Sequence, residues 1–166
     1  MTQTVLWYGA LLSLGFFFAI SMSIFATSKE LDVPHRPGER DRCPVCGMLV
    51  APYADWTGQV QHGDGETVFF DGNKDLFTYL LNLERYATEK NRTNVVAVFV
   101  TNYYDGEMIS ARTAFFVTGS NVMGPMGQEL VSHRSIEAAE DFMADHKGER
   151  ILRFDEVSEE ILRNLQ

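Results

Sequence analysis

Residues 5–26 form an uncharged apolar run, VLWYGALLSLGFFFAISMSIFA. A helix of about 20 such residues spans a hydrocarbon core of about 30 Å, so the run is long enough to cross a membrane. A cleavable signal peptide is the alternative, but no Lys or Arg precedes the run, and it is long for the apolar part of such a signal. No cysteine follows it directly, which excludes lipid attachment there. We predict that residues 1–28 are a transmembrane anchor helix or an uncleaved signal.

The charges beside this run leave its orientation open. Positive residues counted alone favour a cytoplasmic location for whatever follows the span. They are Lys29, Arg36, Arg40 and Arg42. Acidic residues alternate with them, and the positive-inside rule is a bias rather than a law.

The rest of the chain divides into a short linker and one domain. Residues 29–41 are polar and contain Pro34, Pro37 and Gly38, which predicts a linker, and the domain is expected over 42–166. Hydrophobic residues make up 45% of the chain, enough for a packed core. The net charge of -9 argues against nucleic-acid binding, which requires a basic face.

The pattern of the domain predicts an α+β fold of two successive ββα units in one compact domain. The turn residues Gly63-Asp64-Gly65 indicate a hairpin of strands 58–62 and 66–70, followed by a helix over 73–86. Strands are expected at 95–101 and 108–117, then a loop at 119–127 and a strand at 129–132. Ser135 is the expected N-cap of a helix ending near residue 146, before a strand at 150–154 and a helix at 157–165.

Both cysteines of the chain lie in Cys43-Pro-Val-Cys46, followed by Gly47 and Met48. A structural zinc site needs four ligands, commonly from a second cysteine pair or paired histidines. There is no second pair, and the four histidines are scattered, so a zinc site would require distant histidines to converge.

Two further chemistries compete for the cysteine pair. Thiol–disulfide exchange typically places C-x-x-C at a helix N-terminus after a strand, whereas a polar linker precedes Cys43. A soft-metal site suits the segment better, because thiolate and thioether ligands select Cu(I). Cys46 and Met48 provide these two donors on either side of a glycine.

The segment Val122-Met-Gly-Pro-Met-Gly127 offers two more thioethers. Met126 is the favoured ligand of the two, and Met123 the less favoured one. His133 could complete a trigonal site, although a solvent-facing or capping role is more common for such a histidine. His62 ends a predicted hairpin strand and is expected at the surface.

These motifs together resemble the NosL family of copper chaperones, which serve the maturation of nitrous oxide reductase. The resemblance lies in C-x-x-C-G-M at 43–48, F-D-G at 70–72, G-P-M-G-x-x-L-V at 124–131 and the ending at 148–155. It covers residues 42–160.

The resemblance implies a NosL-like domain of paired ββα units on the periplasmic side of the membrane. It would bind Cu(I), act beside an ABC-type transporter complex, deliver the ion to nitrous oxide reductase or another cuproenzyme, and not itself be an enzyme. Carried over to this chain, the ligands are Cys43 or Cys46, Met48 and Met126. Many members are lipoproteins with an acylated cysteine, whereas this chain has the apolar run instead. An envelope thiol–disulfide oxidoreductase is the alternative function.

Overall fold

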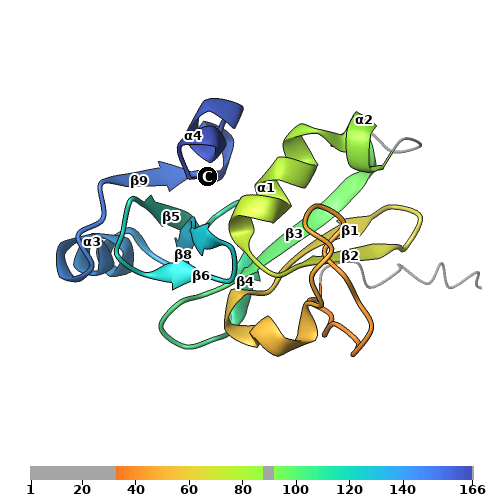
Figure 1. The fold of residues 1–166 in the computed structure, drawn as a ribbon, viewed down its shortest axis with the longest axis horizontal. Helices are drawn as coiled ribbons and strands as arrows, with labels where there is room; N and C mark the ends of the chain where they lie inside the picture. Colours follow the sequence, from red (N-terminus) through yellow and green to blue (C-terminus); the bar gives the residue numbers. More distant parts are fainter. Residues whose placement is uncertain (1–32, 88–91, 166) are drawn as a thin grey trace, which may run out of the picture.

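The computed structural model describes residues 33–87 and 92–165 (Figure 1). The predicted anchor lies outside the described residues. Within them, no helix is both long enough and apolar enough to cross a membrane.

The first sheet is antiparallel, with strand order β2-β1-β3-β4. Its strands are β1 (Gly58–His62), β2 (Thr67–Phe70), β3 (Val95–Thr101) and β4 (Met108–Ser110). The predicted hairpin is confirmed: the His62 N–H donates to the Glu66 carbonyl, and Gly65 adopts φ +91°, where glycine is favoured. This sheet is the platform on which the next helix packs.

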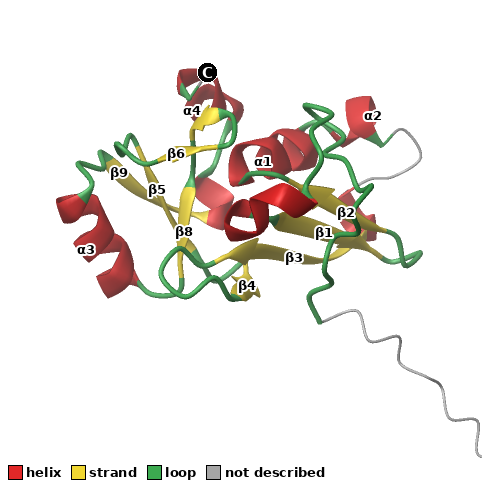
Figure 2. Ribbon diagram, turned by 60° about the horizontal axis from the view of Figure 1, so that its bottom comes forward, coloured by secondary structure: helices red, strands yellow, loops and turns green. Residues whose placement is uncertain are grey.

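Helix α1 (Asn73–Leu81) packs against the first sheet, as Figure 2 shows. The prediction of one helix over 73–86 is wrong at its middle. Asn82 leaves the helical region at φ -127° and ψ 44°, and its N–H bonds to the Tyr79 carbonyl. A short second helix, α2 (Leu83–Tyr86), follows this break.

The second sheet has the order β8-β5-β9, with β5 (Phe115–Thr118), β8 (Val131–His133) and β9 (Arg150–Arg153). Helix α3 (Ile136–Asp145) packs against it, and the Ser135 side chain accepts from the Ala138 N–H as the predicted N-cap. The prediction of a single strand over 108–117 is wrong. A turn closed by the Ala114 N–H on the Ser110 carbonyl divides it into β4 and β5, which belong to different sheets.

Short elements complete the domain. The expected loop at 119–127 contains a small hairpin of β6 (Met123–Gly124) and β7 (Gly127–Gln128). Three 3₁₀ helices are present among the described residues: η1 (Ala51–Trp56), η2 (Arg92–Asn94) and η3 (Phe154–Glu156). Helix α4 (Glu159–Asn164) closes the chain against α1 (Figure 1).

One core joins the two sheets. Phe70, Leu76 and Phe77 from the first half pack with Phe116 and Leu152 from the second, all nearly inaccessible to solvent. A smaller cluster around Phe142 lies between the second sheet and α3. Residues 33–87 and 92–165 therefore form a compact α+β domain, as predicted.

The other face of β1 is covered by the start of the described chain. The Gln59 side chain exchanges hydrogen bonds with the His35 backbone, and the Gln61 side chain donates to the Val33 carbonyl at 2.7 Å. Residues 33–35 of the expected linker thus lie against the domain and allow two glutamines to be buried on a central strand.

Candidate metal site

The cysteines lie in a tight loop closed by its own backbone. Arg42 and Leu49 form an isolated antiparallel bridge, the Cys43 N–H donates to the Met48 carbonyl, and the Gly47 N–H donates to the Cys43 carbonyl, both at 2.9 Å. Gly47 adopts φ +80°, a conformation that side-chain-bearing residues rarely take. This glycine turns the chain directly after Cys46.

Both thiols point to the first turn of α1 and donate hydrogen bonds to carboxylates. The Cys43 Sγ lies 3.2 Å from Asp75 Oδ2, and the Cys46 Sγ lies 3.2 Å from Asp71 Oδ1. Asp71 precedes the N-cap Gly72, and Asp75 lies in the first turn. Asp71 therefore meets the loop from just before the helix and Asp75 from its first turn.

These four side chains form a compact set of possible metal ligands. The two sulfur atoms and one oxygen from each carboxylate all lie within 4.8 Å of one another. Cys43 and Asp71 are each 1% exposed, and neither cysteine forms a disulfide. Asp71 Oδ2 is buried without a hydrogen-bond partner in the part of the chain that the structure describes, so this oxygen is available to a bound ion. The group could hold a metal ion.

The surroundings of the thiols keep them protonated when no metal is bound. Burial, together with the nearby carboxylates, raises the pKa of Cys43 far above its usual value and that of Cys46 to about 12. Backbone N–H groups of Val45 and Cys46 on the Cys43 sulfur, and of Met48 on the Cys46 sulfur, act in the opposite direction. A metal ion binding here must therefore displace protons.

The predicted thioether ligands lie on two loops. Met48 is half-buried in the cysteine loop itself. Met126 and Met123 belong to the β6–β7 hairpin and are 46% and 53% exposed. This hairpin is attached to the first turn of α1, because the Lys74 ammonium donates to the Met126 carbonyl at 2.8 Å. Asp75 follows Lys74, so the structure brings the backbone of Met126 to the helical turn that also faces the cysteines.

The structure places His133 in a different environment. Its ring is fully buried, with its centroid 4.6 Å from that of Phe142 and 6.0 Å from that of Tyr103. Burial, and to a lesser extent His146, lower its pKa to about 4. The expectation of a solvent-facing or capping histidine is wrong, and His133 is not a member of the four-residue group.

His62 also departs from its prediction. It was expected at the surface but is fully buried, and its Nε2 lies 2.9 Å from the Tyr79 hydroxyl. Side chains alternate along a strand, so His62 shares the face of β1 that carries Gly58 and Val60, and this face packs against α1.

Sequence reasoning missed Asp71 and Asp75. A signal existed, since Asp71-Gly-Asn-Lys-Asp75 puts two carboxylates one turn apart at the start of a predicted helix. That spacing alone is common on solvated helices, and only the packing of the cysteine loop on α1 identifies it as part of a site.

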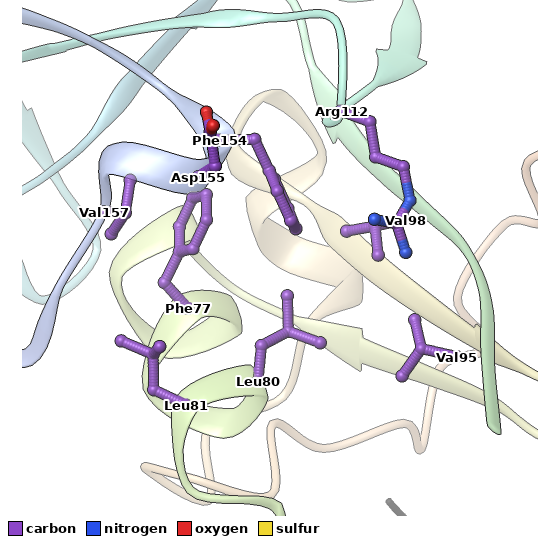
Figure 3. A pocket seen from close by; sticks show the side chains of 9 residues that line it. All are labelled: Phe77, Leu80, Leu81, Val95, Val98, Arg112, Phe154, Asp155 and Val157. Atoms are coloured by element: carbon purple, nitrogen blue, oxygen red, sulfur yellow. The ribbon is translucent and has the colours of Figure 1, made fainter. Parts of the chain in front are cut away.

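An apolar pocket of about 330 Å³ opens on another side of α1 (Figure 3). It is lined by Phe77, Leu80, Leu81, Val95, Val98, Arg112, Phe154, Asp155 and Val157. Phe77 and Leu80 lie on the face of α1 roughly opposite Asp75, since α-helices turn about 100° per residue. The pocket contains no cysteine or methionine and is separate from the thiol site.

Known proteins are similar to this chain in sequence and in fold. The copper-binding lipoprotein NosL of Stutzerimonas stutzeri is 29% identical over 126 residues, covering 75% of this chain and 66% of the relative, so the chain spans just under two thirds of that protein. The crystal structure of the copper chaperone NosL from Shewanella denitrificans matches with a TM-score of 0.65 and 27% identity, covering 77% of this chain and 97% of the other.

The match extends over both sheets and the thiol site. The model of the NosL family matches residues 34–162, which include the cysteine loop, both aspartates and the β6–β7 hairpin. This chain belongs to the NosL family.

Proposed function

We propose that this protein is a Cu(I) metallochaperone that carries the ion as cargo and delivers it to an extracytoplasmic cuproenzyme. The observation that supports this best is the pair of free, convergent thiols with a methionine in the same loop, in a family whose solved member is named a copper chaperone. The proposed ligands are Cys43, Cys46, Met48 and Met126.

The donor chemistry suits Cu(I), because soft thiolate and thioether ligands select this ion. Cys43 is buried, whereas Cys46 is half-buried and adjoins Gly47 and Met48, so Cys46 and Met48 form the half-site that an incoming ion meets first. Met126 closes the site from the hairpin attached to Lys74. Met123 on the same hairpin is the alternative thioether. His133 is left out of this set because aromatic rings enclose it.

Release to the client proceeds by ligand exchange. A donor from the client replaces Met126 first, because that residue is about half exposed and lies on a two-stranded hairpin that ends in a tight glycine turn. The thiolates then leave in turn. A mixed set of thiolates and thioethers permits this order, since thioethers are neutral and need not regain a proton to dissociate.

The family and the N-terminal run support a proposal for the client and the location. We propose nitrous oxide reductase as the client, with an ABC-type transporter complex beside it. The chain would be held at the membrane, with the domain on the extracytoplasmic side. The Stutzerimonas relative is named a lipoprotein, which fits an anchored domain. In this chain the uncharged residues 5–26 would serve as the anchor.

A competition titration with a Cu(I)-specific chelator tests the ligand set. Met48→Leu and Met126→Leu should each weaken Cu(I) binding by roughly tenfold, because each removes one soft donor and leaves an apolar side chain of similar size. Met143→Leu on α3 is the matched control and should bind as the parent does. Unchanged affinity in both test variants would remove the thioethers from the site, and no Cu(I) binding by the parent would refute the function.

A further inference from the structure

We infer that the apolar pocket beside α1 binds a small organic anion, an aliphatic or aromatic monocarboxylate whose apolar part fills the pocket while Arg112 holds its carboxylate (Figure 3). The inference goes beyond the proposed function and does not depend on it. No cysteine or methionine lines the pocket, and its α1 residues lie on the face of that helix roughly opposite Asp75.

The walls of the pocket are apolar and are held in place by their neighbours. The Phe77 ring meets the Phe116 ring edge-on, with centroids 5.1 Å apart, and tilts against the Phe154 ring at 5.2 Å. Val98 and Val157 are buried members of the main core. A ligand therefore meets a preformed apolar surface and has to order few side chains, which lowers the entropic cost of binding.

The volume of the pocket suits a small organic molecule. At about 330 Å³ it lies near the lower end of the range for small-molecule sites. An apolar cavity of about 150 Å³ holds one benzene molecule, so this pocket has room for a group of roughly twice that size, such as two fused rings or a medium-length alkyl chain. Leu80, Leu81 and Val95 are only half-buried, so a ligand can enter from solvent without unfolding the core.

Arg112 gives the pocket its preference for an anion. Its guanidinium carbon lies 5.4 Å from the centre of the Phe154 ring, and within residues 33–87 and 92–165 the side chain forms no hydrogen bond or ion pair. In Figure 3 the Arg112 side chain reaches along the pocket, whereas the Asp155 carboxylate points away from the apolar side chains. The N–H donors of Arg112 can therefore take a carboxylate in the bidentate arrangement that a guanidinium favours.

Two short turns fix the cation and the aromatic ring at the edge of the pocket. Arg112 lies in the turn between β4 and β5, which the Ala114 N–H closes on the Ser110 carbonyl. Phe154 begins η3, which the Glu156 carboxylate caps. Because both turns are closed by their own hydrogen bonds, the fold itself sets the placement of the cation relative to the apolar walls.

Fluorine NMR with 6-fluoro-2-naphthoate tests the inference on the full chain in lipid nanodiscs, with empty nanodiscs as the blank. We expect saturable binding of one molecule per chain. The neutral amide of the same acid should bind at least about tenfold more weakly, because it cannot form a charge-assisted pair with Arg112. An acid that binds no more tightly than its amide would overturn the inference, and so would the absence of saturable binding.

Variants of the pocket locate the binding. Arg112→Leu should weaken naphthoate binding by roughly tenfold or more, to the level of the amide, and Arg112→Lys should lie between, since lysine keeps the charge but loses the planar fork. Leu80→Trp, which fills the pocket, should abolish binding of both acid and amide. Arg163→Leu, at an exposed arginine on α4 outside the pocket, is the matched control and should bind as the parent does.

Circular dichroism checks that each variant is folded, and Arg112 is itself exposed, so its replacement leaves the core intact. Parent-like binding by folded Arg112→Leu would refute the assigned role of the cation, and parent-like binding by folded Leu80→Trp would refute the pocket. Self-association of the parent that Arg112→Leu abolishes without any ligand would assign the pocket to a second copy of the chain and overturn the inference.

Discussion

The Glu129 carboxylate accepts a hydrogen bond from the Lys74 backbone N–H, although the two residues are far apart in the chain. The same Oε1 atom accepts from the Leu130 N–H at 2.9 Å. Helix α1 has Gly72 as its N-cap, which offers no side chain, so Glu129 supplies the missing cap from the second half of the domain. The contact ties the methionine hairpin to the helical turn that faces the cysteines.

Glu129→Ala is expected to lower the free energy of unfolding by about 1–3 kcal/mol, because it leaves two backbone N–H groups without their acceptor in a buried place. Urea denaturation followed by circular dichroism measures the change. Glu140→Ala, at an exposed glutamate on α3, is the control and should change the free energy of unfolding by less than about 0.5 kcal/mol. Equal losses in the two variants would mean that Glu129 does not cap α1.

Local signals in the sequence were sufficient for much of the fold. The Asp64-Gly65 turn predicted the first hairpin, and Ser135 with its apolar stripe predicted α3, because both depend on interactions within a few residues. The prediction of one strand at 108–117 was wrong because the outcome there depends on residues far away in the chain. Its two halves are both β-formers, and only pairing with different sheets, decided by distant partners, separates β4 from β5.

The candidate site could be predicted only in part. The residue type and spacing of Cys43 and Cys46 identify them as a candidate metal or redox site without reference to any other residue. Asp71 and Asp75 acquire a role only when the cysteine loop lies on α1, a contact between segments about 30 residues apart. The burial of His133 likewise depends on α3 and on the loop that carries Tyr103.

The buried His133 should make the protein less stable in acid. Its pKa of about 4 in the folded protein lies below the ordinary 6.5, so the unfolded chain binds the proton first. Its contribution is fully present above pH 6.5 and is lost as the pH falls toward 4, by about 3 kcal/mol at most. His133→Phe should therefore gain stability relative to the parent across that window. Denaturation at pH 8, 6 and 4.5 measures the free energy of unfolding of both proteins. A difference between variant and parent that is the same at all three pH values would contradict the prediction.

Gly58 lies where β1 passes close to α1. A Cβ at this position would stand 2.6 Å from Leu76 Cδ1, a member of the shared core. Gly58→Ala is expected to lower the free energy of unfolding by about 1–3 kcal/mol through overpacking. Gly63→Ala is the control, since its Cβ would meet Val96 at an ordinary 3.5 Å. Thermal denaturation of both variants distinguishes a local clash from a general effect of adding a methyl group to this hairpin.

Cu(I) affinity should rise steeply with pH, because burial places the pKa of Cys46 at about 12 and that of Cys43 higher still. Below those pKa values each coordinated thiol must release one proton, and apparent affinity then rises about tenfold per pH unit for each thiol. Chelator competition at pH 6, 7 and 8 should give, for the parent, a slope near two when the logarithm of the apparent Cu(I) affinity is plotted against pH. Cys43→Ser should reduce it to about one, because only Cys46 then loses a proton. A slope already near one in the parent would leave Cys43 protonated outside the copper site, and a flat profile would mean that neither thiol binds the ion as a thiolate.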